Sequence, residues 1–151
     1  MSGNPQLQSN GLSVAASISN RVVQLMSAYT GRGPTKAWTS IDHDLVSVVL
    51  RDTLTKGERS LVSDGRSQLV LDMRKAYQQT MRKDLISAVE QSTGRKVIAF
   101  LSDNHIEPDI AIESFVLEPT PEIERATQQS DGQAKEAFGI TGRRPIAPRY
   151  R

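Results

Sequence analysis

The sequence lacks cysteine entirely, has few aromatic residues and contains no long apolar run. Without cysteine, disulfides, thiolate metal sites and cysteine nucleophiles are excluded. Aromatic residues make up 5% of the chain, so a core must be built from Leu, Val, Ile and Ala. The longest apolar run, residues 97–101, is strand-sized and far below the roughly 20 residues of a membrane-spanning helix. The first residues do not resemble a secretory signal. We therefore expect a cytoplasmic protein that reaches a membrane only through a partner.

The chain also lacks a strong excess of charge, because its formal net charge is only +2. Residues 1–118 contain 13 Lys and Arg against 13 Asp and Glu, and are therefore neutral. The excess lies at the end of the chain, where residues 142–151 contain four arginines and no acid. A basic tip of this kind does not predict nucleic-acid binding by a folded domain. Weak nucleic-acid binding through Trp38 and this Arg-rich end is an alternative of low rank.

Apolar residues in the first third of the chain follow a helical and then a strand-like pattern. From Leu12 to Tyr29 they recur every three or four positions, which predicts a helix with one buried stripe. The glycines of residues 31–34, Gly-Arg-Gly-Pro, are expected to end this helix. Residues 36–41 and 45–50 are rich in strand-forming residues and flank a polar turn, so they predict a β-hairpin.

A long helix is predicted next. Thr55 and Glu58 have the spacing of a capping box, and Gly94 is placed to end the helix near Thr93. Because nearly 40 helical residues would exceed the size of a small domain, we expect a break near residues 63–65 or a projecting helix that supports a dimer. Its basic residues are interleaved with acids, which is typical of a solvated face. These basic residues are Arg66, Arg74, Lys75, Arg82 and Lys83.

The predicted elements define an α+β fold. Residues 97–101 and 110–117 predict a second hairpin, joined by a turn over residues 102–108. The order α-ββ-α-ββ predicts a two-layer sandwich, in which two helices cover a four-stranded antiparallel sheet made from two hairpins. We expect a flexible N-terminus over residues 1–11, the folded domain over 12–118, and a disordered tail over 119–151. A short helix is expected near residues 122–128 of that tail.

Three segments are notable for their order and spacing. Residues 29–37 read Tyr-Thr-Gly-Arg-Gly-Pro-Thr-Lys-Ala, residues 54–59 read Leu-Thr-Lys-Gly-Glu-Arg, and residues 100–109 read Phe-Leu-Ser-Asp-Asn-His-Ile-Glu-Pro-Asp. Together they resemble the MpsC family over about residues 12–118. That family is named for a sodium-translocating, membrane-potential-generating system. The resemblance implies a small bacterial protein associated with a membrane system for ion or inorganic-carbon uptake. It implies no catalytic residue and no cofactor.

The loop Gly31-Arg32-Gly33 is the first candidate binding site. Two glycines permit a tight backbone whose N–H groups can face an anion, and Arg32 can grip a phosphate or carboxylate with two parallel hydrogen bonds. The nearby Lys36 adds a second cation. The simpler interpretation is a helix stop, with Pro34 leading into the strand.

The turn that contains Asp103, Asn104 and His105 is the second candidate and can complete the same anion or nucleotide site. The simpler interpretation is a polar hairpin turn, because Asp and Asn tolerate left-handed geometry. A metal site that combines His105 with Glu107 and Asp109 is conceivable, but no metal is expected. The other histidine, His43, lies in the first predicted turn. It shares one end of the sheet with His105 only if the two hairpins pack side by side with both turns at that end.

No catalytic constellation stands out, so we expect a protein that is not an enzyme. Serine occurs in no Gly-x-Ser-x-Gly motif, and the acids are scattered over turns and helices. The leading hypothesis is an accessory or regulatory homodimer that binds a subunit of a membrane ion-uptake system. The second hypothesis is a sensor of a small anion or nucleotide.

Overall fold

The protein divides into two compact units, Met1–Glu118 and Pro119–Arg151. The structure, a computed structural model, describes residues 5–122 and 129–130. The Arg-rich end of the chain and most of the helix predicted near residues 122–128 lie outside the described residues. The fold that follows is that of the first unit.

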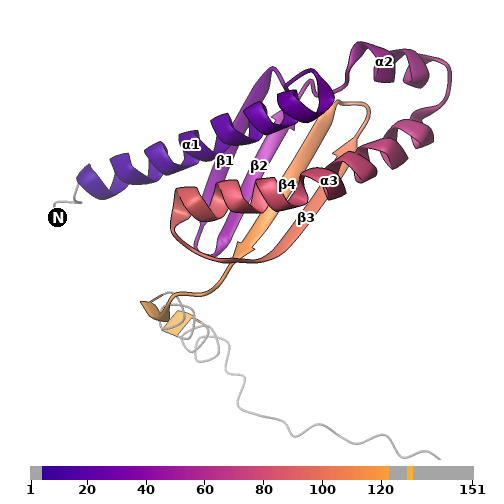
Figure 1. Cartoon of the computed structure of the whole chain (residues 1–151). Coiled ribbons are helices and arrows are strands. Elements are labelled where there is room, and N and C mark those ends of the chain that lie inside the picture. Colours follow the sequence, from indigo (N-terminus) through magenta and orange to yellow (C-terminus); the bar gives the residue numbers. More distant parts are fainter. Residues whose placement is uncertain (1–4, 123–128, 131–151) are drawn as a thin grey trace, which may run out of the picture. The chain divides into compact units, whose positions relative to one another are not determined.

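Three helices and four strands make up this unit, in the order α-ββ-α-ββ with the second helix broken in two (Figure 1). The α+β prediction is thereby confirmed. The elements are α1 (Pro5–Thr30), β1 (Lys36–Asp42), β2 (Leu45–Arg51), α2 (Lys56–Ser63), α3 (Ser67–Thr93), β3 (Val97–His105) and β4 (Ile110–Leu117).

The four strands form one antiparallel sheet in the order β1-β2-β4-β3. The second hairpin therefore pairs with the first through β4 and β2, and β1 and β3 are the two edges. The register places Lys36 opposite Arg51, Arg51 opposite Ile110, and Ile110 opposite His105. These four residues form a row across one end of the sheet.

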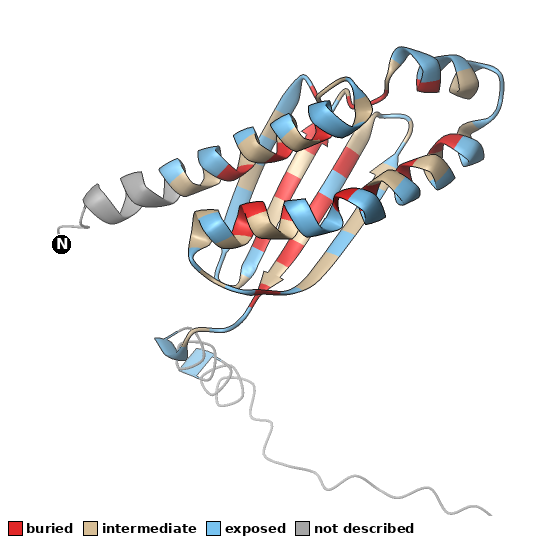
Figure 2. Ribbon diagram, in the orientation of Figure 1, coloured by how far each residue is buried: buried red, intermediate tan, exposed pale blue. Residues whose placement is uncertain are grey.

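The core lies between the sheet and the two long helices. Figure 2 shows the buried residues on the inner faces of α1 and α3 and at alternate positions along the central strands. In β2 the core-facing residues are Val46, Val48 and Leu50, each fully buried, as the alternation of a strand requires. No element of residues 5–118 covers the other face of the sheet, which we call the open face.

Two elements are longer than the sequence indicated. Helix α1 begins at Pro5 instead of Leu12, because proline suits the first helical position and the residues that follow continue the helix. Strand β3 continues through Ser102 to His105, so the predicted turn over residues 102–108 is wrong in its first half. The polar side chains of this segment lack the apolar alternation that predicts a strand. The segment nevertheless pairs regularly with β4, with Ser102 opposite Glu113.

The signals for helix ends were correct. Thr55 N–H donates to Glu58 Oε2 at 2.7 Å and Glu58 N–H donates to Thr55 Oγ1 at 3.2 Å, which is the predicted capping box. The expected break separates α2 from α3, where Gly65 has a φ of 76°. Gly94 ends α3 with a φ of 68°, in the left-handed region that favours glycine.

Candidate functional site

Polar side chains from the three family-like segments meet at one end of the domain. The loop after α1, the segment between β2 and α2, and the turn between β3 and β4 all reach this end. We call the resulting set of bonded side chains the end network. Its members are Arg32, Asp52, Thr53, Glu58, Arg59, Arg74, Asn104 and Asp109.

Arg32 joins the loop after α1 to the segment after β2. Its Nη1 donates to the carbonyl oxygens of Asp52 at 2.7 Å and Leu54 at 2.9 Å, and its Nη2 donates to the Asp52 carboxylate at 2.8 Å. Arg59 contacts the other carboxylate oxygen of Asp52. The side chain of Thr35 and the guanidinium of Arg32 hold the pKa of Asp52 below its usual value. Both terminal nitrogens of Arg32 are therefore already engaged within the protein.

Arg74 occupies the buried part of the network. Only 7% of its side chain is exposed, and its Nη2 lies 2.8 Å from Glu58 Oε2, which is 4% exposed. The same guanidinium donates to both the hydroxyl and the carbonyl oxygen of Thr53 at 2.8 Å, and to Asn104 Oδ1 at 3.3 Å. The prediction that Arg74 belongs to a solvated face is wrong. It lies one helical turn from Val70 and from Gln78, both buried, and so on the inner face of α3.

Asp109 ties the β3–β4 turn to the segment before α2. Its two carboxylate oxygens accept hydrogen bonds from the Thr53 hydroxyl at 2.8 Å and from the Leu54 N–H at 2.9 Å. Arg59 Nη2 lies 3.8 Å from the second of these oxygens. A cavity of only about 10 Å³ borders Glu58 and Arg74. That volume is about the size of one water molecule.

The structure brings together only some of the predicted binding residues. Arg32 and Asn104 belong to the end network, while Gly31 and Gly33 flank Arg32 in its loop. Gly33 packs tightly, since a Cβ there would lie 3.3 Å from Val23 Cγ1.

The remaining predicted residues project on the open face. Lys36 and His105 occupy opposite edges of the sheet, three strand spacings or about 14 Å apart. Asp103 is two residues before His105 on the same edge strand. A single ligand site that uses all seven residues stays a prediction.

The two histidines lie at opposite ends of the sheet. Because β4 runs antiparallel to β2, the β3–β4 turn with His105 is at the far end from the β1–β2 turn with His43. His43 Nδ1 lies 2.7 Å from Asp42 Oδ1, and His105 Nδ1 lies 2.8 Å from the carbonyl oxygen of Pro108. Among the described residues, no group of three or more His, Asp and Glu side chains is arranged to hold a metal ion.

A family model described as "Na+-translocating membrane potential-generating system (MpsC)" matches residues 11–119. The chain belongs to the MpsC family. No curated protein and no solved structure matches it. The matched residues cover all of the α+β unit after residue 10 and include every member of the end network. None of the helices among the described residues combines the length and the apolar character that a membrane-spanning helix requires.

A buried carboxyl is a second polar feature of the MpsC domain that the sequence analysis did not single out. Glu113 is fully buried at a core-facing position of β4, where Gln78 of α3 donates to its Oε1 at 3.3 Å. Burial raises the pKa of Glu113 to about 7, and the neighbouring side chains of Ser102, Gln78 and Arg74 offset only part of this effect. In the described part of the chain, Glu113 Oε2 and Ser102 Oγ have no hydrogen-bond partner.

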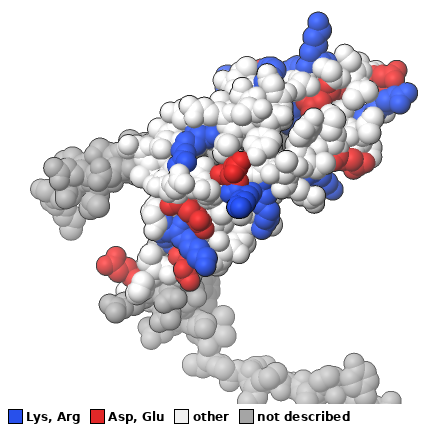
Figure 3. Space-filling model, viewed as in Figure 1, with Lys and Arg blue, Asp and Glu red and all other residues white. Residues whose placement is uncertain are grey.

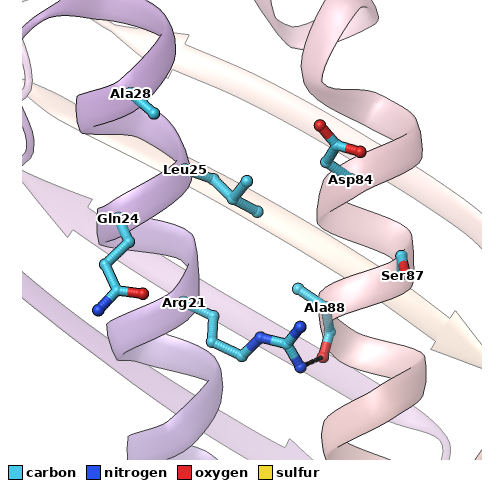
Figure 4. Close-up of a pocket in the computed structure, with 7 residues that line it drawn as sticks. All are labelled: Arg21, Gln24, Leu25, Ala28, Asp84, Ser87 and Ala88. Carbon is cyan, nitrogen blue, oxygen red and sulfur yellow. Dashed lines mark hydrogen bonds between the residues drawn. The ribbon is translucent and has the colours of Figure 1, made fainter.

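Among the surface grooves that border α3 in the described part of the chain, one lies against α1 and another against β3. In the first, about 420 Å³ in volume, Arg21 reaches from α1 across to α3 and donates to the carbonyl oxygen of Ala88 (Figure 4). Leu25 projects between the two helices there. The second groove, about 150 Å³, lies between α3 and β3, with Lys75 and Arg82 among its lining residues. On the helix-bearing side of the domain, basic and acidic side chains are intermixed (Figure 3), a pattern that does not favour nucleic-acid binding there.

Proposed function

We propose that this protein is a non-enzymatic accessory or regulatory subunit, which binds a protein component of a Na⁺-translocating, membrane-potential-generating system. The family match supports the cellular context, because it covers the sheet, α2, α3 and most of α1. The end network supports the mode of action, because its members from the family-like segments, among them Arg32, Glu58 and Asp109, are bonded within the protein without a substrate.

The observation that carries this proposal is the mutual bonding of those polar side chains. An active site normally holds an acid, a base or a nucleophile that faces a space for the substrate. Here Arg74 donates to Glu58, Thr53 and Asn104, and the neighbouring cavity has room for one water. The network therefore ties α2 and the β3–β4 turn to the rest of the domain, and recognition is left to the outer surface.

Photo-crosslinking in cells that contain the other components of the system tests the proposal. A photoreactive amino acid would replace Gln24 beside the α1–α3 groove, Gln79 on α3, or Ile98 on the edge strand, all of which are exposed. We expect a specific cross-link to one subunit of the membrane system from at least one position. Folded protein that cross-links to no such subunit from any of the three positions would overturn the proposal.

A small-anion sensor is a second candidate function. The groove between α3 and β3 favours it, because the cations Lys75 and Arg82 are among its lining residues. The sequence pattern predicts an anion at Arg32 instead. Thermal-shift titrations with phosphate and small carboxylates distinguish the two sites. If the anion binds in the groove, Arg82→Ala should abolish the shift in melting temperature. If it binds at the loop, Arg32→Ala should abolish that shift. If no anion shifts the melting temperature, neither site is a sensor.

A further inference from the structure

The two edges of the sheet differ in how their outward backbone groups are treated. On β3, Arg82 Nη1 donates to the carbonyl oxygen of Phe100 at 3.4 Å. The Asn104 N–H donates to the carboxylate of Asp103 at 2.8 Å, and the register of β3 with β4 shifts near its start. Charged side chains and bulges of this kind keep an edge strand from pairing with another chain. On β1, the pairing with β2 continues without a shift over all seven residues.

The backbone groups that β1 directs away from the sheet follow from the alternation of an antiparallel ladder. The Leu117 N–H donates to the carbonyl oxygen of Asp44 at 2.7 Å, so even-numbered residues of β2 face β4 and odd-numbered ones face β1. The residues of β1 opposite these odd-numbered ones are even-numbered, and the others direct N–H and C=O outward. No side chain of the described residues bonds to these outward groups. They belong to Ala37, Thr39 and Ile41.

The sequence of β1 is complementary to itself when two copies run antiparallel. With Thr39 opposite Thr39 of a second copy, all seven residues overlap and Lys36 lies opposite Asp42. A twofold axis forms this pair twice. Sliding the copies by two residues in either direction shortens the overlap to five residues and leaves Lys36 without Asp42 opposite it. Charge and length therefore favour the same register.

This register also matches the outward backbone groups. Thr39 opposite itself and Ala37 opposite Ile41, the latter twice, are all pairs of outward-facing residues, and together they form about six backbone hydrogen bonds. Ile41 lies on the same face as its buried neighbour Val46, yet it is 38% exposed because no strand lies beyond β1. A second copy would cover this exposed part of Ile41.

Helix α1 leaves room for a second copy beside β1. It lies over this strand, since Ser19 Oγ is 2.7 Å from Thr39 Oγ1. Arg21 and Leu25 project from α1 toward α3 (Figure 4). The side of α1 that is turned away from α3 carries only short side chains, so the α1 helices of two copies can pack at the usual distance of about 8–10 Å. These side chains, at the helical spacing of one face, are Ala16, Asn20, Val23 and Ser27.

We infer that β1 pairs antiparallel with β1 of a second copy, about a twofold axis at Thr39, so that two four-stranded sheets become one continuous sheet. Main-chain hydrogen bonds supply the affinity, and the two pairs of Lys36 with Asp42 set the register. The interface is only about 24 Å long, and narrow interfaces are weak. This dimer is independent of the proposed membrane partner, because the purified chain is sufficient to form it.

Charge exchange tests the register. Sedimentation velocity of the full chain between about 1 and about 300 µM should show a monomer–dimer equilibrium. Lys36→Asp or Asp42→Lys should each raise the dissociation constant about tenfold, because each makes both pairs repulsive. The double variant should return it to near the wild-type value. Lys83→Asp, at an exposed position of α3, is the matched control and should have no effect.

Disulfide trapping tests the direction of the strands. Because the chain contains no cysteine, an introduced cysteine is its only thiol. In a mixture of Lys36→Cys and Asp42→Cys, the two Cα atoms of the pair should lie about 4.5 Å apart, within disulfide range, and each mixed dimer keeps one charge pair. In either variant alone the two cysteines lie about 20 Å apart. The disulfide should therefore form mainly in the mixture, and Lys83→Cys in place of Asp42→Cys measures random collision.

Three results would overturn the inference. They are a wild type that stays monomeric up to about 300 µM, a dimer that neither charge variant weakens, and a disulfide between positions 36 and 42 that forms no faster than the collision control. A fourth result is that β1 instead receives an extended segment of a membrane subunit. The purified chain would then stay monomeric, and a photoreactive residue at position 42 would cross-link in cells to that subunit and not to a second copy.

Discussion

Replacement of Glu113 by glutamine should stabilise the protein, and by more at high pH than at low pH. Glutamine has the shape of the protonated acid and keeps the contact with Gln78, but it cannot ionise. The ordinary pKa of 4.5 applies to the unfolded chain, whereas burial raises the pKa of Glu113 to about 7 in the folded protein. Between these values the folded state binds the proton more tightly than the unfolded state does.

The sign and size of the effect follow from this difference. Because the folded state holds more protons, the free energy of unfolding of the wild type must fall as the pH rises from about 4.5 to about 7. At about 1.4 kcal/mol for each pKa unit, ionisation of the buried carboxyl costs about 3 kcal/mol above pH 8. We therefore expect Glu113→Gln to gain about 1 kcal/mol at pH 5 and about 3 kcal/mol at pH 8 over the wild type.

Urea unfolding at pH 5, 6, 7 and 8, followed by circular dichroism, measures these differences. Glu118→Gln, at an exposed position just after the same strand, is the matched control and should follow the wild type at every pH. A stability gap between Glu113→Gln and the wild type that stays constant across this range would refute the reasoning. It would mean that the carboxyl finds a partner or reaches water in the folded protein.

Three further substitutions test other parts of the fold by urea unfolding. Arg74→Met should cost about 3–5 kcal/mol, because it leaves the Glu58 charge buried without an opposite charge. Arg74→Met combined with Glu58→Met should cost much less, and equal losses would contradict this. Thr55→Ala should cost about 1 kcal/mol through loss of the capping box, and an unchanged midpoint would show that Glu58 caps α2 alone. Gly94→Ala should cost about 1 kcal/mol, because alanine is strained at a φ of 68°; a stabilised variant would refute that cause.

Much of the fold could be predicted because its signals are local. A capping box spans four residues, a glycine that ends a helix acts at one position, and the alternation of β2 and β4 is visible within eight residues. These signals correctly placed the four strands, the break before α3 and the end of α3. The extension of β3 was missed because Ser102 and Asn104 are polar, although their pairing with β4 makes them strand residues.

The candidate site was less predictable because its partners are distant in sequence. The Gly31–Gly33 loop indicates an exposed arginine, and only the folded chain brings the carbonyl groups of Asp52 and Leu54 to Arg32.

The sequence nevertheless contains a signal that Arg74 and Glu113 are buried. Arg74 lies at the helical spacing of the apolar stripe, between Val70 and Met81, and Glu113 lies between Ala111 and Phe115 at a core-facing position. A charge at a core position predicts a buried partner or a raised pKa, and neither can be identified from one segment alone.

The way in which α2 is attached has a consequence for how the domain opens. This helix is only eight residues long and packs mainly against α3, and its one buried side chain is Glu58, which is held by Arg74. Few apolar contacts join it to the rest of the domain, so its attachment depends on that ion pair and on the contacts of Arg59 with Asp52 and Asp109. We therefore expect residues 56–63 to unfold locally, as a unit, at a free energy well below that of global unfolding, so that their amide hydrogens exchange while the sheet stays protected.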